Sequence, residues 1–175
     1  MKKGMIIFML LFAFMGGCSK NLDFATDEPF IVVSSSIAGP DIARNFYPTN
    51  ISLYDNGKLV LHTETTEKIV IGEDAPIVEM QLEENEVDNV KRLIKKNGFW
   101  KFKEDVSDDD SVDGSFLYIT VNLTDESKTV GGLNPDHPEF NDIADYVRKL
   151  VSDDDYRWWN KEIKEYIIET NPELE

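Results

Sequence analysis

Hydrophobic and polar residues alternate in several short segments of the chain, and this alternation predicts β-strands. The clearest case is 115–124, in which every second residue from Leu117 to Leu123 is apolar. A period of two places this apolar set on one face of an antiparallel sheet, so we expect the strand to be half-buried. Apolar and β-branched runs predict further strands at 30–37, 51–54, 59–63, 69–71, 77–82 and 128–130.

One pair of these strands is expected to form a β-hairpin. The dipeptide Asn56-Gly57 stands between 51–54 and 59–63. It favours the positive φ angles that a two-residue type I′ turn requires, so we predict that turn here.

A period of three to four residues predicts helices elsewhere. The first begins after Glu83 and ends before Gly98, the second follows Pro138, and the third begins at Ser152. Ser152 and Asp155 have the spacing of a capping box, with Asp in place of Glu. Strands, helix, strands, helix, helix is the order of an α+β fold: we predict an antiparallel β-sheet packed on one side by about three α-helices.

The N-terminus has the pattern of a secretory signal. Lys2 and Lys3 precede an uncharged run at 5–15, and Gly16, Gly17 and Cys18 follow it. A transmembrane helix needs about 20 apolar residues, so the run is too short to span a bilayer. The stretch Phe14-Met15-Gly16-Gly17-Cys18 resembles the lipobox of bacterial lipoprotein precursors.

That resemblance implies a lipid anchor. The cysteine of a lipobox receives a diacylglyceryl group, with palmitate-type chains, and cleavage makes it the first residue. We therefore expect a signal peptide at 1–17, the lipidated Cys18 with a flexible tether at 18–29, and one globular domain at 30–175. The protein is expected to be extracytoplasmic and held at the bacterial cell membrane.

The net charge of the chain limits the kinds of partner that it can bind. The chain has 18 basic and 34 acidic residues and a formal charge of −16, which excludes a nucleic-acid backbone as a partner. Cleavage before Cys18 would leave 16 basic residues against 34, a charge of −18. We expect such a domain to be repelled by anionic headgroups and to stand off the membrane. The single cysteine excludes an intrachain disulfide.

The best candidate site in the sequence is an acidic loop. Asp109, Ser111 and Asp113, followed by Gly114, fit the first, third, fifth and sixth positions of an EF-hand calcium loop. The twelfth position is Thr120 instead of a bidentate Glu, so the match fails there. The alternatives are a weak calcium site and a loop kept in solvent by its charges.

Catalytic motifs are absent from the sequence. A carboxylate-dependent hydrolase using Asp136 with His137, or members of the acidic cluster at 108–113, is an alternative hypothesis. The domain also resembles uncharacterised small lipoproteins of Gram-positive bacteria, through the hairpin at 53–59, the segment Gly98-Phe99-Trp100 and the segment Asp113-Gly114-Ser115. This resemblance implies a lipid-anchored α+β domain.

We therefore expect a non-catalytic binding or accessory module, with an immunity or inhibitor role as one form of it. Its partner is expected to be an envelope protein, a wall component or a basic ligand, and no cofactor is predicted.

Overall fold

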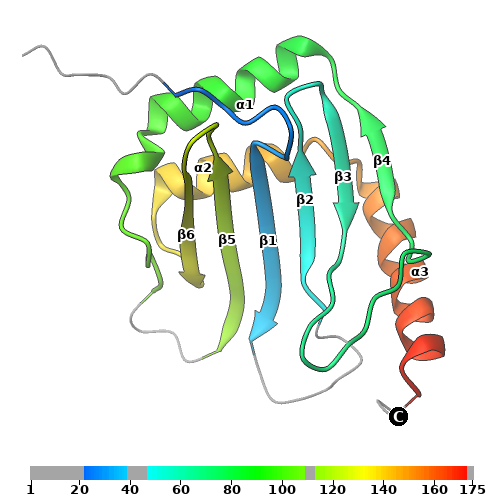
Figure 1. Cartoon of the computed structure of the whole chain (residues 1–175). Coiled ribbons are helices and arrows are strands. Elements are labelled where there is room, and N and C mark those ends of the chain that lie inside the picture. Colours follow the sequence, from blue (N-terminus) through cyan, green and yellow to red (C-terminus); the bar gives the residue numbers. More distant parts are fainter. Residues whose placement is uncertain (1–21, 39–46, 109–112, 173–175) are drawn as a thin grey trace, which may run out of the picture.

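A six-stranded antiparallel sheet and three α-helices make up the structure. It is a computed structural model that describes residues 22–38, 47–108 and 113–172 (Figure 1). The strands are β1 (Ile31–Ala38), β2 (Thr49–Leu53), β3 (Lys58–His62), β4 (Val78–Gln81), β5 (Gly114–Asn122) and β6 (Ser127–Leu133). The helices are α1 (Glu84–Asn97), the short 3₁₀ helix η2 (Phe99–Lys101), α2 (Pro138–Arg148) and α3 (Asp153–Thr170). The predicted α+β class is confirmed.

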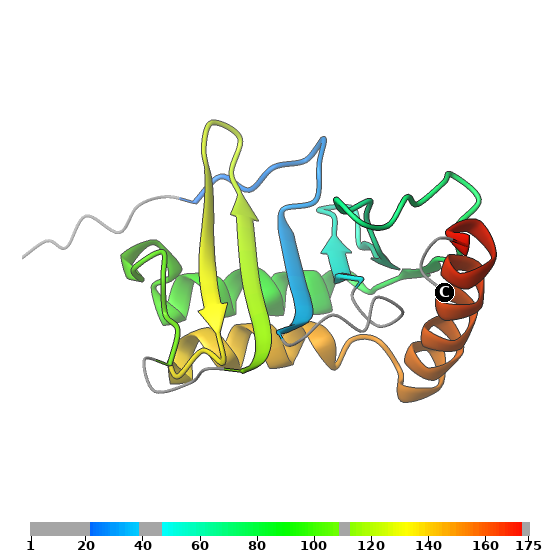
Figure 2. The same ribbon diagram turned by 90° about the horizontal axis from the view of Figure 1, so that it is seen from below.

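The sheet has the strand order β4-β3-β2-β1-β5-β6, and every neighbouring pair is antiparallel. Helices α1 and α2 lie side by side across one face, and α3 stands beside the β4 end (Figures 1 and 2). We call the helix-bearing side the covered face. Its strand residues are buried and apolar: Ile31, Val33, Ile51, Leu53, Leu59, Leu61, Ile119, Val121 and Val130.

The opposite side, which we call the open face, is mostly polar. It carries the intervening residues of the same strands, among them Ser34, Asn50, Ser52, His62, Tyr118, Thr120 and Thr129. These side chains pair across strands: the Ser34 hydroxyl donates to Asn50, and the hydroxyls of Thr120 and Thr129 lie 2.8 Å apart. In the described part of the chain, no helix covers this face.

The predicted hairpin is present, but its turn differs from the prediction. Gly57 has a φ of +86°, while Asn56 does not adopt a positive φ. The Gly57 N–H donates to the Tyr54 carbonyl at 3.0 Å, and the Tyr54 N–H donates to the Lys58 carbonyl at 2.9 Å. This is a three-residue loop, in which a tight turn is followed by one left-handed glycine. The type I′ prediction is therefore wrong.

The segment 69–71 is not a strand. Ile69 is fully buried, but its neighbours bond to the last turns of α3 instead of to the sheet. The Val70 N–H donates to Asn171 Oδ1 at 2.9 Å, and the Gly72 N–H donates to the Tyr166 hydroxyl at 2.9 Å. The apolar composition of 69–71 predicts backbone hydrogen bonds to a neighbouring strand. Side-chain acceptors at the C-terminal end of α3 take their place.

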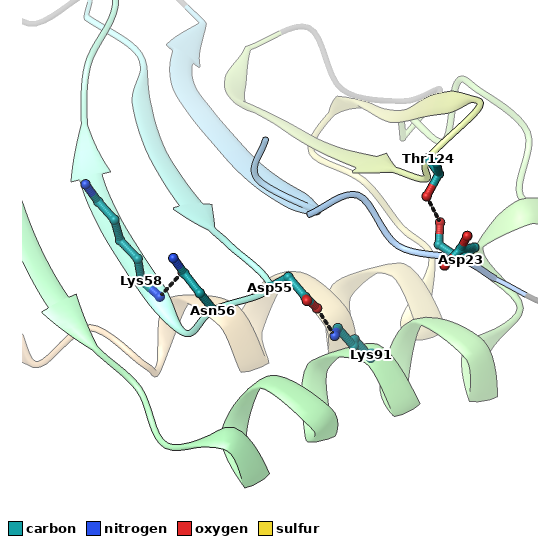
Figure 3. Close-up of polar contacts among 6 residues, drawn as sticks. All are labelled: Asp23, Asp55, Asn56, Lys58, Lys91 and Thr124. Atoms are coloured by element: carbon teal, nitrogen blue, oxygen red, sulfur yellow. Dashed lines mark hydrogen bonds and ion pairs between the residues drawn. The ribbon is translucent and has the colours of Figure 1, made fainter. Parts of the chain in front are cut away.

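The N-terminal segment also differs from the prediction of a flexible tether over 18–29. Phe24 and Ala25 are buried, and Phe24 forms an isolated antiparallel bridge with Leu123. The Thr124 N–H donates to the Asp23 carbonyl at 2.9 Å, and the Thr124 hydroxyl donates to the same carbonyl at 3.4 Å (Figure 3). The tether prediction is therefore wrong for 22–29, where one buried aromatic residue holds the backbone on the domain. Residues 18–21 lie outside the described part.

Candidate ligand-binding cleft

A polar cleft lies at the end of the sheet where β1 ends and where β2 and β5 begin. It has a volume of about 320 Å³ and sits between the last turn of α2 and the first turns of α3. Hydroxyl groups of Ser35, Thr49 and Ser115 line the strand side. This volume is at the lower end of the range typical of small-molecule sites.

Two tyrosines form one wall of the cleft, and both pack on a buried tryptophan. The ring centroids of Tyr47 and Tyr156 lie 6.0 and 6.4 Å from that of Trp159. Trp159 is fully buried, and its indole N–H donates to the Pro76 carbonyl at 2.8 Å. The Tyr47 hydroxyl donates to Asn160 Oδ1 at 2.7 Å. Packing on the buried Trp159 therefore fixes the positions of both tyrosine rings, so this wall of the cleft is preorganised.

Burial keeps these tyrosines protonated. Loss of solvent raises the pKa of Tyr47, and the neighbouring Tyr156 raises it further. Burial also raises the pKa of Tyr156, while the nearby Arg148 guanidinium and a hydrogen bond with Thr49 act in the opposite direction. Because both pKa values lie above that of a free tyrosine, neither hydroxyl ionises in the neutral pH range, and the single O–H of Tyr47 stays bonded to Asn160.

The cleft concentrates positive charge in an acidic protein. Arg148, the last residue of α2, and Lys164, in the middle of α3, both line it. Neither has a carboxylate partner within 4.0 Å among the described residues. The described lining holds no carboxylate, histidine or thiol. Two cations beside several hydroxyl donors can hold a small anion.

Acidic groups lie in two hollows that adjoin the cleft at Arg148. Two adjoining hollows, also lined by Arg148, contain Asp145 and Asp153. Asp153 begins α3, where it complements the positive end of the helix dipole. These carboxylates therefore lie near the cleft but outside its described lining.

The chain matches no family model and no curated protein. The lipoprotein resemblances of the sequence therefore stay predictions, and the cleft rests on its geometry alone. In the described part of the chain, every helix is too short or too polar to cross a membrane.

The candidate residues from the sequence are not among the described residues that line the cleft. Cys18, Asp109 and Ser111 are outside the described residues, so the lipidation and calcium predictions stay untested. Asp113 is exposed, and its backbone carbonyl accepts a hydrogen bond from Asn134 Nδ2 at 2.8 Å. Among described residues, no three His, Cys, Asp or Glu side chains are grouped to hold a metal ion.

Both histidines have structural contacts. His137 precedes α2, where its Nδ1 accepts from the Phe140 N–H at 3.4 Å and its ring packs 4.5 Å from that of Phe102. Its nearest carboxylate is that of Glu139, at 3.4 Å, instead of the predicted Asp136. His62 lies on the open face, 2.9 Å from the Ser52 hydroxyl.

Sequence reasoning missed the cleft because its residues come from separate elements. Arg148 had a sufficient explanation as a cation at the end of a helix, where it complements the dipole. The helical spacing of Trp159, Ile163 and Ile167 indicates one buried side of α3, and all three residues are buried. No periodicity indicates that Tyr47 and Tyr156 both pack on Trp159. Only the packing of α3 against the strand ends brings these residues together.

Proposed function

We propose that the protein is a non-catalytic binding module whose cleft takes a small organic or inorganic anion. The observation that carries this proposal is the pair Arg148 and Lys164, two cations that lack a carboxylate partner among the described residues and share the cleft lining with Ser35, Thr49 and Ser115. A carboxylate or phosphate group placed between them gains charge-assisted hydrogen bonds. The sequence suggested a basic ligand from the net charge, but the local charge of the cleft is of the opposite sign.

Binding without catalysis is the function that the lining supports best. Ser and Thr hydroxyls become nucleophiles when a neighbouring base removes their proton. The described lining of the cleft offers hydroxyls and cations but no histidine or carboxylate to act as that base. Such a lining retains an anion and does not activate an attack on it.

Thermal unfolding in the presence of inorganic phosphate or citrate tests this proposal. A ligand at 100 times its Kd stabilises the folded state by about 2.7 kcal/mol, which raises the Tm of a domain of this size by roughly 5–10 °C. Arg148→Gln should abolish the shift. Lys161→Gln is the matched control, because Lys161 lies one turn from Lys164 and pairs with Glu162 outside the cleft. Equal shifts in the wild type and Arg148→Gln would refute an anion site here.

The second part of the proposal is a lipid anchor on Cys18, which holds the module at the outer surface of the cell membrane. Its basis is the order of positive residues, apolar run, small residues and cysteine at the N-terminus. Two or three acyl chains are enough for stable attachment, whereas one chain is not.

Fractionation of cells and mass spectrometry test the anchor. The wild-type protein should be recovered from membranes with a mass that corresponds to a chain beginning at a diacylglyceryl-modified Cys18. Cys18→Ser should lose both properties, whereas Gly17→Ala, which keeps a small residue before the cysteine, should retain them. An unmodified cysteine in the membrane-bound wild type contradicts this part of the proposal.

A further inference from the structure

Positive charge is segregated in this chain. Residues 89–103 contain six basic residues and no acidic one, in a protein whose formal charge is −16. Five of the six are exposed, and none of these five has an ion-pair partner within 4.0 Å among the described residues. We call this group the basic face; it consists of Arg92, Lys95, Lys96, Lys101 and Lys103.

The interaction of cations with the helix dipole explains only part of the basic face. Lys95 and Lys96 lie in the last turn of α1, where cations complement the helix dipole. Lys101 and Lys103 lie beyond the left-handed Gly98 that ends this helix, so the dipole does not account for them. The face continues from the helix into η2 and the residue pair after it.

The sixth cation, Lys91, joins the basic face to the N-terminal segment. Its ammonium lies 5.7 Å from the ring centroid of Phe24 and 5.3 Å from that of Phe30. It also pairs with Asp55 in the β2–β3 turn, as Figure 3 shows. Lys95 lies 5.3 Å from the same Phe24 ring. The docked N-terminal segment therefore runs along the basic face.

The length of chain before this segment limits where an anchor could hold the domain. Cys18 precedes Leu22 by four residues, which span at most about 15 Å when fully extended. The backbone is fixed from Asp23 onward by its bond with Thr124 and by the burial of Phe24. A lipid on Cys18 would thus bring this end of the domain to the membrane surface.

We propose that the basic face lies against the membrane and binds anionic lipid headgroups, and that the cleft points away from the bilayer. This inference rests on the lipid anchor proposed above. Strand β1 runs from the anchored end at Ile31 to the cleft at Ser35–Ile37, and the stretch from Ile31 to Ile37 spans roughly 20 Å. An anchored module in this orientation offers its cleft to ligands outside the cell.

Local charge decides this contact, although the net charge favours repulsion. Charges separated by more than about 8 Å are largely screened at physiological ionic strength, so a headgroup interacts with the residues directly before it. The carboxylates of Asp23, Asp27 and Glu28 lie on the docked segment beside the face. The contact therefore requires the lysines, rather than these carboxylates, to meet the lipid.

Cys18 allows a direct test, because it is the only cysteine of the chain. The described core lies between Leu22 and Asn171, so a chain that starts at Cys18 keeps the whole fold. Its thiol can be joined to a maleimide lipid in vesicles of phosphatidylcholine, with or without phosphatidylglycerol. The rate of acylation of each lysine is then measured by mass spectrometry.

Phosphatidylglycerol should slow the acylation of Lys95, Lys96, Lys101 and Lys103 roughly threefold or more, because each cation is drawn to the anionic surface. Lys149 and Lys164, which line the cleft and the hollow beside it, should react at unchanged rates. High salt should remove the difference. Equal rates on both kinds of vesicle would overturn the proposal.

Two variants with the same loss of charge separate the face from the net charge. Arg92→Gln, Lys96→Gln, Lys101→Gln and Lys103→Gln together should abolish the protection of Lys95. The control combines Lys68→Gln, Lys149→Gln, Arg157→Gln and Lys161→Gln, and it should leave the protection in place. Protection that persists in the first variant refutes the role of the face. Because the coupling is chemical, this result is independent of whether cells lipidate Cys18.

Discussion

The covered and open faces of the sheet are made by alternate residues of the same strands, yet they differ in almost every property. Ile119 on the covered face is fully buried, while Thr120, the next residue, faces the open side and bonds to Thr129. The covered face is apolar and packs on α1 and α2. The open face carries hydroxyls, amides and an imidazole that pair with one another across the strands.

This difference indicates which face fixes the register. A shift of one residue would turn the apolar set of every strand toward the open side, so burial on the covered face specifies the pairing. The open face contributes little to that choice and is free to carry polar groups. Substitutions on the two faces should therefore differ in cost, and the following four test how far the contrast holds.

The largest effect is expected from Ile119→Ala. Its side chain is fully buried between the sheet and the helices, so truncation removes buried methyl groups and leaves a cavity. The expected loss is about 2–5 kcal/mol of unfolding free energy, measured by urea denaturation. A loss below about 1 kcal/mol would mean that the covered face repacks easily, and the contrast between the faces would fail.

Gly131→Ala should be an exception to the expectation that substitutions on the open face cost little stability. Gly131 pairs with Tyr118, and an added Cβ would lie 2.4 Å from the Tyr118 ring and 2.3 Å from the Leu117 carbonyl oxygen. The ring can rotate away, but the backbone carbonyl has to shift. We expect a loss of about 1–3 kcal/mol, in the range of overpacked sites.

Tyr118→Ala combined with Gly131→Ala separates these two contacts. If the ring is the obstacle, the double variant recovers the stability lost by Gly131→Ala. If the carbonyl is the obstacle, as its shorter distance indicates, the loss persists.

Asn122→Ala should have a smaller, localised effect. Asn122 lies at the end of β5 on the open face, and its side-chain amide donates to the Pro29 carbonyl at 2.8 Å. Removal leaves that carbonyl without its donor, at a cost of about 1–2 kcal/mol. Hydrogen exchange should quicken at Ala25 and Thr124, whose amides hold the N-terminal segment. Ser127→Ala, which keeps the Pro29 bond, should leave both amides protected.

The sequence predicted the covered face well because burial leaves a periodic pattern. The three helices and their apolar stripes are confirmed, and the Ser152 hydroxyl accepts from the Asp155 N–H at 3.1 Å as the capping pattern indicated. The error at 69–71 has the same origin: Ile69 is buried, as its composition indicated, but it packs beside α3. Composition predicts burial and does not specify the element that covers a residue.

Contacts between distant segments could not be predicted in the same way. The docking of 22–29 depends chiefly on Phe24, a single aromatic residue in a polar stretch, which no periodicity marks. The cleft depends on Tyr47 meeting α3 across more than a hundred residues. The candidate site named from the sequence, Asp109 with Ser111, lies outside the described residues, so its calcium prediction is still open.

The smallest effect is expected from Thr129→Ala. Among the described residues its hydroxyl bonds only to that of Thr120, and Thr129 is exposed, so water can replace the lost partner. The unfolding free energy should change by no more than about 0.5 kcal/mol. When Thr129→Ala and Ile119→Ala are measured in the same buffer, the difference between their losses of unfolding free energy gives the contrast between the two faces directly. A loss above about 1.5 kcal/mol would mean that water does not reach the open face in solution. A concentration series would then show whether a second copy of the chain covers it, because stability that depends on association rises with protein concentration.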